Sequence, residues 1–230
     1  MSAFAQAVLG LAVGYLAASL IESTAHQWVS DAPGARVRWW KKHPRLFRLF
    51  IETHYSHHTI HHFKTFRRNH VTQFRSEDER AALDAELSGH GTHGQLIREA
   101  QYAVKLQGSG GWTFVAPLLL FLPVIYALLG VSGTLGSLVT MALPPLFSNY
   151  VHPYLHMPHA AARAAAPPVI SWFLKTRYGR AMARNHFIHH RYGGTSNFNL
   201  VLGGDILRGV HRKPSVKDFE TMQEIGLRWN

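Results

Sequence analysis

Two long stretches of the sequence carry no charged side chain, and this distribution limits the fold more than any other feature. Residues 1–21 and 112–151 contain no Lys, Arg, Asp or Glu. All 24 Lys and Arg residues lie in 22–111 (13 residues) and 152–230 (11 residues). The run from Ala3 to Ile21 has 19 residues, and as a helix it would span about 28 Å, close to a bilayer's hydrocarbon core. The sequence therefore predicts an integral membrane protein.

Two further apolar runs lie in the second charge-free stretch. They cover residues 112–129 and 135–151, and the segment Gly-Val-Ser-Gly-Thr between them is typical of a turn. With residues 3–21 they predict three membrane helices, the last two as a hairpin, with Pro144 and Pro145 interrupting the third run. Two other interpretations are buried helices of a soluble core and, for the first run, a signal peptide, although the usual basic start is missing.

The basic residues predict the orientation. Lys and Arg concentrate on the cytoplasmic side of membrane proteins, so residues 22–111 and 152–230 are predicted to be cytoplasmic and the N-terminus to lie across the membrane. The net charge of +11 fits loops that face anionic headgroups. No nucleic-acid recognition motif accompanies this charge, so no nucleic-acid partner is expected. We predict that residues 1–230 form one domain, an all-α integral membrane helical bundle.

Histidine is unusually frequent, with 17 among 230 residues, and cysteine is absent. The lack of cysteine excludes disulfides, Cys-type zinc sites, iron–sulfur clusters and thiol nucleophiles. The histidines form the pattern His-x-x-His-His at 54–58 and at 186–190, and His-x-x-x-His at 152–156. On an α-helix, His61 and His62 would continue the first pattern, so that a sector of about 140° would carry five imidazoles.

These patterns predict a metal centre. Imidazole is the commonest protein ligand for metals, and several imidazoles on one face are costly without a partner. The three motifs hold eight histidines, and His26, just after the first apolar run, makes nine. Nine are too many for one ion and suit two. Nitrogen-rich ligand sets accept iron, zinc, copper or nickel. Because they lie just beyond apolar runs, they are predicted to converge in a di-metal cap at the cytoplasmic face. The predicted ligands are His26, His54, His57, His58, His152, His156, His186, His189 and His190.

The order of these motifs resembles that of the membrane-bound fatty acid hydroxylase and sterol desaturase superfamily. Its members carry His-x-x-x-His or His-x-x-x-x-His, then His-x-x-His-His, His-x-x-x-His and a final His-x-x-His-His on a helical membrane scaffold. The resemblance covers residues from about 20 to 212. The segment 197–209, Asn-Phe-Asn-Leu-Val-Leu-Gly-Gly-Asp-Ile-Leu-Arg-Gly, also resembles the family's sequence after its last motif.

The resemblance implies an oxygenase with two iron ions, for which zinc can substitute in a purified sample. Such an enzyme uses O2 to hydroxylate or desaturate a C–H bond of a lipid, here a fatty acyl chain, a sterol or another terpenoid lipid. No flavin or nicotinamide motif and no haem domain is recognisable, so electrons are expected from a separate donor such as a ferredoxin or a cytochrome b5. A basic cytoplasmic surface would suit an acidic donor.

A non-enzymatic function is the alternative, in which the same histidines store or move metal ions. A transporter would place its ionisable ligands at the bilayer midplane, whereas these histidines lie at the predicted helix ends.

The first motif departs from the family pattern. A second histidine is expected four or five residues after His26, but Ser30 and Asp31 occupy those positions. Three interpretations are open: Asp31 is a carboxylate ligand, which iron accepts; His43 takes the place; or one metal is under-ligated. His61 and His62 are extra to the pattern and offer another replacement.

Other predictions concern the cytoplasmic segments. Residues 76–88 predict an exposed helix that begins with a capping box of Ser76 and Glu79 and ends at Gly89. Residues 89–94, Gly-His-Gly-Thr-His-Gly, predict a flexible loop with two solvated histidines. Residues 169–183 predict a helix at the membrane interface. For Asp205 the alternatives are a turn residue and an acceptor that orients a ligand histidine.

Overall fold

The computed structural model describes residues 1–66, 69–102 and 109–227, which are mostly helical and contain no strand. The predicted all-α class is therefore confirmed. Three of the helices, marked η, are π-helices. In chain order the helices are α1 (Ala3–Ala25), η1 (His26–Ser30), α2 (Gly34–Lys42), α3 (Pro44–His54), η2 (Tyr55–Thr65), α4 (Glu77–Ser88), α5 (Gly91–Glu99), α6 (Ser109–Phe114), α7 (Ala116–Leu119), α8 (Leu122–Met141), α9 (Leu143–Leu146), η3 (Phe147–Val151), α10 (His152–Leu155), α11 (His159–Ala165), α12 (Pro168–Lys175), α13 (Arg177–Arg191), α14 (Gly204–Leu207) and α15 (Val216–Glu224).

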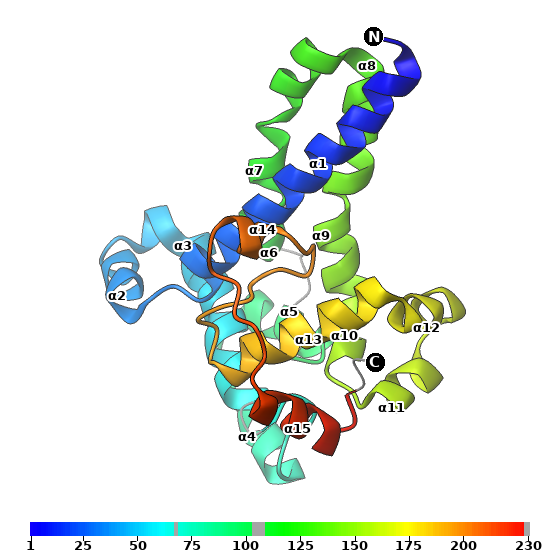
Figure 1. The fold of residues 1–230 in the computed structure, drawn as a ribbon. Coiled ribbons are helices and arrows are strands. Elements are labelled where there is room, and N and C mark those ends of the chain that lie inside the picture. The colour runs from blue at the N-terminus through cyan, green and yellow to red at the C-terminus, as the bar shows by residue number, and fades with distance from the viewer. Residues whose placement is uncertain (67–68, 103–108, 228–230) are drawn as a thin grey trace.

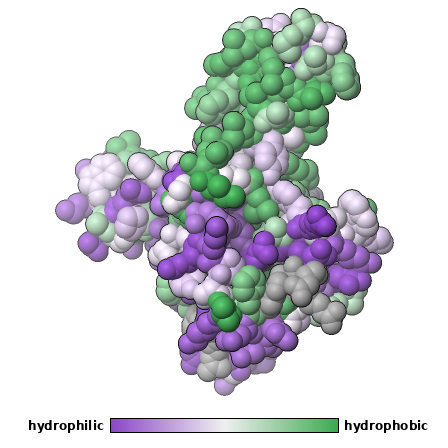
Figure 2. Space-filling model, in the orientation of Figure 1, coloured by the Kyte–Doolittle hydropathy of each residue, from purple (hydrophilic) through white to green (hydrophobic). Residues whose placement is uncertain are grey.

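An apolar stalk projects from a broader polar part (Figures 1 and 2). The stalk consists of α1, α7 and α8. The chain rises through α7, reverses within α8 and returns beside α1 (Figure 1). Gly130 makes this reversal, with φ +63° and ψ −165°, a conformation that glycine adopts far more readily than other residues. The predicted hairpin is thus present, and its turn lies at Gly130 alone.

Small residues hold α1 against the returning half of α8. A Cβ atom built on Gly10 would lie 2.0 Å from the carbonyl oxygen of Gly133, and one on Gly14 would lie 2.4 Å from that of Ser137. The Ser137 hydroxyl donates a hydrogen bond to the Gly10 carbonyl at 2.9 Å. Close backbone approach through small residues is the way helices associate in lipid, where large apolar side chains gain nothing by turning inward.

The predicted membrane helices differ from the observed elements in the middle run. Two stretches, Ala3–Ser30 and Leu122–Leu155, are long and apolar enough to cross a membrane, and the second includes the reversal at Gly130. The run 112–129 is not one helix: it is divided among α6, α7 and the start of α8. Pro117 and Pro123 each lie in the first turn of a new helix, because proline has no N–H to donate to the preceding turn.

The polar part surrounds the lower end of the stalk and contains several small cores. Helix α13 packs against α10 and α12 through Leu155, Leu174 and Met182, which are almost fully buried. On another side, α4 and α5 pack against η2 around Ile60 and Leu87. These contacts bring η2, α10 and α13, which carry most of the histidines, to one place.

The structure corrects one loop prediction and one helix prediction. The segment predicted as a flexible loop after Gly89 instead forms the start of α5, because Gly94 allows α5 to lie directly on the Leu87 carbonyl of α4. The predicted helix 169–183 is divided into α12 and α13 at Thr176, whose side chain accepts a hydrogen bond from the Gly179 N–H at 3.0 Å and caps α13. The helix predicted over 76–88 is confirmed as α4, with Ser76 as its N-cap. Of the predicted capping box, the Ser76 side chain accepts from the Glu79 N–H at 3.3 Å, whereas the Glu79 carboxylate accepts from the Arg75 N–H at 2.7 Å.

Candidate metal centre

Each of three π-helices lies at or next to histidines of the predicted motifs. Backbone bonds from residue i+5 to residue i join Asp31 N to His26 O at 2.8 Å and Phe66 N to His61 O at 3.1 Å. The N–H of His152 likewise bonds to Phe147 O. Such π-helical turns change the angular spacing of side chains and occur frequently at functional sites. In η2 the wider turn brings Nε2 of His57 and of His62, five residues apart, to within 3.0 Å.

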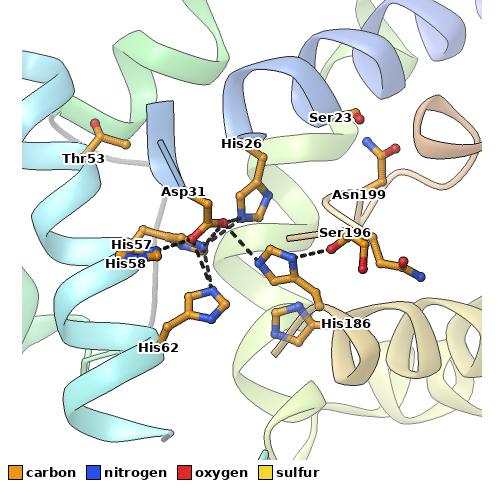
Figure 3. A network of polar contacts seen from close by, with 12 residues as sticks. Ser23, His26, Asp31, Thr53, His57, His58, His62, His186, Ser196 and Asn199 are labelled. Carbon is orange, nitrogen blue, oxygen red and sulfur yellow. Dashed lines mark hydrogen bonds and ion pairs between the residues drawn. The ribbon is translucent and has the colours of Figure 1, made fainter. Parts of the chain in front are cut away.

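One group of ligand atoms, which we call the carboxylate site, is formed by His26, Asp31, His57 and His189. The Asp31 Oδ2 atom lies 3.3–3.4 Å from the Nε2 atoms of all three histidines. The Nε2 atoms of His26 and His57 lie 2.8 Å apart. Figure 3 shows the side chains of His26, Asp31 and His57 converging. His189 of α13 meets the same carboxylate. The Asp31 side chain is only 1% exposed, so the carboxylate serves these rings and not solvent.

A second group, which we call the histidine site, contains five imidazoles and no carboxylate: His61, His152, His156, His186 and His190. The Nε2 atom of His186 lies 2.9 Å from the Nε2 atoms of both His152 and His156. The potential ligand atoms all lie within 4.8 Å of one another. Helix α10 places its two histidines one turn apart, with Pro153 in the first turn as predicted.

Backbone carbonyl groups orient several of these rings through Nδ1. His156 donates to the His70 carbonyl and His189 to the Ser196 carbonyl, each at 2.8 Å, and His61 donates to the Tyr102 carbonyl at 3.2 Å. A carbonyl can only accept, so Nδ1 carries the proton in each ring. The Nε2 lone pair is thereby directed into the site, as in metal-ligating histidines.

The donor atoms left without hydrogen bonds fit a metal centre. Nε2 of His61, His189 and His190 and Oδ2 of Asp31 are buried and have no hydrogen-bond partner within the described part of the chain. Leaving such atoms unpaired in the interior is costly. Each of them belongs to one of the two groups, so bound ions would satisfy them together. Nitrogen-rich, thiol-free sets of this kind suit iron, zinc, copper or nickel.

Burial and mutual repulsion keep the histidine site uncharged. The pKa values of His61, His156, His186 and His190 are well below the ordinary value of 6.5, first because burial penalises the charged imidazolium and then because neighbouring imidazoles repel one another's charge. Their rings are therefore neutral near pH 7, which is the form that binds a metal.

The carboxylate site behaves differently. Burial alone would raise the pKa of Asp31, but His57 and His62 hold it well below its ordinary range. Burial would lower the pKa of His189, yet its contact with Asp31 outweighs this effect and raises that pKa above 6.5. The neighbouring rings thus favour the anionic form of Asp31, and Asp31 in turn favours the protonated form of His189.

The two sites lie side by side. The ring centroids of His57 and His61 are 5.5 Å apart, and the His62 ring lies between the sites, stacked on His190 at 4.1 Å. A cavity of about 30 Å³ touches His26 and His57 of one site and two histidines of the other, and Phe114 and Leu200 also line it. This volume accommodates about two water-sized molecules.

Seven of the nine predicted ligands lie in the two groups, and two lie outside them. The His58 Nδ1 atom is 2.8 Å from Asp31 Oδ1, so His58 contacts the carboxylate instead of facing the other histidines. His54 packs on the His58 ring at 4.8 Å between centroids. The predicted α-helical spacing does not apply here because η2 is a π-helix, and this geometry admits His61 in their place.

The structure also decides between the alternatives for the first motif. Asp31 occupies the position of the expected second histidine in the carboxylate site. His43 is exposed at the start of α3, where its ring packs on Trp39 at 5.5 Å, so its proposed role is wrong. His70 is buried, and its Nε2–H donates a hydrogen bond to the Leu155 carbonyl at 2.7 Å.

A buried polar network ties the C-terminal segment to α1 behind the sites. Asp205 accepts hydrogen bonds from the Ser23 hydroxyl at 2.6 Å and from the Asn199 N–H at 2.8 Å. Glu22 accepts from the Val201 N–H at 2.8 Å. The interpretation of Asp205 as an acceptor for a ligand histidine is therefore wrong. It fixes the turn that begins at Ser196, and the Ser196 carbonyl in turn orients His189.

Comparisons of the chain with protein-family models, curated protein sequences and solved structures found no match.

Proposed function

We propose that the protein is a membrane-bound dimetal oxygenase that hydroxylates or desaturates a C–H bond of a lipid, with iron in both sites. The observation that carries this proposal is the convergence of two adjacent, buried groups of imidazole and carboxylate donors near the lower end of an apolar stalk. When bound, a pair of iron ions supplies the one-electron and O2 chemistry that no amino-acid side chain provides. The resemblance of the histidine motifs to the fatty acid hydroxylase and sterol desaturase superfamily supports the same reaction class.

The chain's own residues would hold and orient the donors and keep water away. The carbonyl groups that fix Nδ1 of His61, His156 and His189 set the direction of each lone pair before any ion arrives. Phe114 and Leu200, only 5% and 7% exposed, shield the cavity between the sites. Limiting the access of water to such a cavity protects a reactive oxidant from side reactions.

The stalk supports a location in the membrane. In the apolar windows of Ala3–Ser30 and Leu122–Leu155, only 22% and 28% of residues are buried, so large apolar side chains face outward while glycines face the neighbouring helix. A soluble core helix would show the reverse. Exposed aromatic side chains at the lower end of the stalk, Trp28, Trp112 and Tyr150, are typical of a membrane–water interface.

The proposed partners follow from this arrangement. A lipid in the bilayer can reach the lower end of the stalk without crossing water, which places its chain close to the cavity. We assign the polar part to the cytoplasmic face from its excess of Lys and Arg. Electrons would come from a separate ferredoxin or cytochrome b5, for which a basic surface provides complementary charge.

The test is to load purified protein with iron in lipid nanodiscs and expose it to isotopically labelled O2 and a reducing system. We expect about two iron ions per chain and either label in the lipid or a new double bond. Replacing His186 and His190 together by Ala leaves three imidazoles in the histidine site and should lose about one ion per chain and the activity. His43→Ala, which changes an exposed histidine outside both sites, should keep the metal and the activity.

Tightly bound metal without any lipid product, across acyl, sterol and terpenoid lipids, would instead favour the alternative of metal storage or transport. An unchanged metal content in the variant that lacks both His186 and His190 would contradict the histidine site itself.

A further inference from the structure

Helices α2 and α3 form a separate hairpin beside the lower end of α1, away from α4 and α15 (Figure 1). The hairpin has its own small core, in which Val37 and Trp40 of α2 pack with Phe47 and Phe50 of α3. This core explains why the hairpin keeps its shape, and it leaves most of the residues from Arg38 to Leu49 exposed.

The outward side chains of the hairpin are strongly basic. Residues 32–51 contain six Lys and Arg residues and no Asp or Glu. Arg48 forms an ion pair with Glu52 at 2.8 Å, but Arg38, Lys41, Lys42 and Arg45 are exposed and have no ion pair within the described residues. A dense group of exposed cations creates a positive surface potential, which attracts an anionic partner.

Large apolar side chains are exposed among these cations. Leu46 is 81% exposed, and Trp28 and Trp39 are 55% and 51% exposed. The Arg36 guanidinium lies 4.7 Å from the Trp28 ring centroid, in a cation–π contact. Tryptophan, leucine and basic residues together are the composition of helices that lie in the headgroup region of a membrane.

We propose that the α2–α3 hairpin is a binding surface for anionic lipid headgroups. It follows directly on η1 at the end of α1, so it lies where the proposed membrane surface meets the polar part. Exposed apolar groups beside cations favour lipid over an acidic electron donor, because such a donor would satisfy the charges and leave Leu46 and Trp39 in water. The inference rests on the proposed membrane location but not on the oxygenase reaction.

The hairpin also lies in the chain between two potential ligands of the carboxylate site. Asp31 immediately precedes it and His57 follows it, so the anchored hairpin would fix the chain between two ligands of one site. Anionic lipid at the hairpin would thereby favour the arrangement in which both ligands meet.

The absence of native cysteine allows a direct test, because an introduced cysteine is the only labelling site. A spin label is placed at Leu46→Cys on the hairpin, at Leu128→Cys on the stalk, or at Val216→Cys, which is 76% exposed on α15. Each protein is reconstituted in nanodiscs of phosphatidylcholine with or without phosphatidylglycerol. Membrane depth is measured from the accessibility of the label to oxygen and to a water-soluble nickel chelate.

We expect the Leu46 label to lie at the headgroup level in discs that contain phosphatidylglycerol and the Val216 label to stay in water. Replacing Arg38, Lys41, Lys42 and Arg45 by Gln should reduce the preference for phosphatidylglycerol by roughly fivefold per cation. The matched control replaces four exposed cations elsewhere, Arg80, Arg98, Lys213 and Lys217, and should keep that preference.

An aqueous Leu46 label, with the Leu128 label in hydrocarbon, would overturn the inference and leave the membrane location intact. If the Leu46 label stayed aqueous until a ferredoxin was added, the hairpin would be a donor-docking surface and the inference would be wrong. If the Leu128 label were also aqueous, the membrane location itself would fail.

Discussion

The carboxylate site and the histidine site lie side by side, yet they differ in the number and charge of their donors. Three imidazoles and one carboxylate form the first, and five imidazoles form the second. In the carboxylate site, one oxygen of Asp31 contacts all three rings and the other contacts His58. In the histidine site, the rings contact one another and the group contains no carboxylate. The first site therefore depends on a single residue, and the second distributes its donors over η2, α10 and α13.

This difference has an electrostatic consequence. An anion in a buried pocket offsets part of the charge of a bound cation. Asp31 should therefore contribute more to the metal affinity of the carboxylate site than any one histidine does. The histidine site has no such charge and relies on donor number. We therefore expect the two proposed ions to respond differently to the loss of one ligand, to the loss of a supporting contact and to pH.

The largest effect is expected for Asp31→Ala. Because this change removes the only anion of its site, the metal content should fall from about two ions to about one per chain, and lipid oxidation should be lost. Metal analysis after gel filtration provides the measurement, and circular dichroism checks the fold. Asp78→Ala, at an exposed carboxylate of α4, is the matched control.

A further variant sharpens this result. Asp31→His supplies the nitrogen donor that the family pattern has at this position, so it should retain more of the second ion than Asp31→Ala does. Two tightly bound ions in Asp31→Ala would show that the carboxylate is not a ligand.

Asp31 was one of several alternatives that the sequence offered for the group that accompanies His26. The packing of the chain determines that Asp31, and not His43, lies beside His26. Local hydropathy predicts the apolar runs and the hairpin turn, since both depend on nearby residues. The position of His43 depends on Trp40, which is 3% exposed in the core of the α2–α3 hairpin and holds the start of α3 away from the sites. No local pattern in the sequence reports that contact.

The sequence pattern also did not indicate which histidines of 54–62 face the two sites. An α-helical spacing places all five on one face, but η2 is π-helical and selects His57 and His61 as potential ligands. A π-helix has no clear sequence signature, because its i+5 hydrogen bonds form where tertiary contacts favour them. The motifs therefore predicted which segments meet, and the backbone geometry determined which rings face inward.

The next largest effect is expected for His190→Ala in the histidine site. Four imidazoles remain there, so at saturating metal the protein should still hold about two ions, while the affinity of that site falls on the order of 100-fold. Competition with a chromophoric chelator measures this loss, with His43→Ala as the control. If the chain instead loses one ion outright, as in Asp31→Ala, the two sites do not differ in redundancy.

A smaller effect is expected for His58→Ala. The His58 ring contacts the Asp31 oxygen that does not face the three ligand rings, so it positions the carboxylate. Loss of such an orienting contact costs about tenfold in metal affinity, and only in the carboxylate site. His54→Ala removes the ring that packs on His58 and should have less effect. An equal loss in the histidine site would contradict a positioning role.

The smallest effect is expected from pH, and metal binding should depend on pH more strongly in the carboxylate site than in the histidine site. The raised pKa of His189 means that a proton must leave this ring when metal binds near neutral pH, whereas His61, His156, His186 and His190 are already neutral. Lowering the pH through the His189 pKa should weaken metal binding in the carboxylate site first, by about tenfold per pH unit.

Calorimetry of metal binding in buffers of different ionisation enthalpy counts the protons that are released. About one proton should accompany the ion that Asp31→Ala loses and almost none the ion that it keeps. Equal proton release at both sites would show that the Asp31 carboxylate does not hold a proton on His189, and the electrostatic distinction between the sites would then fail.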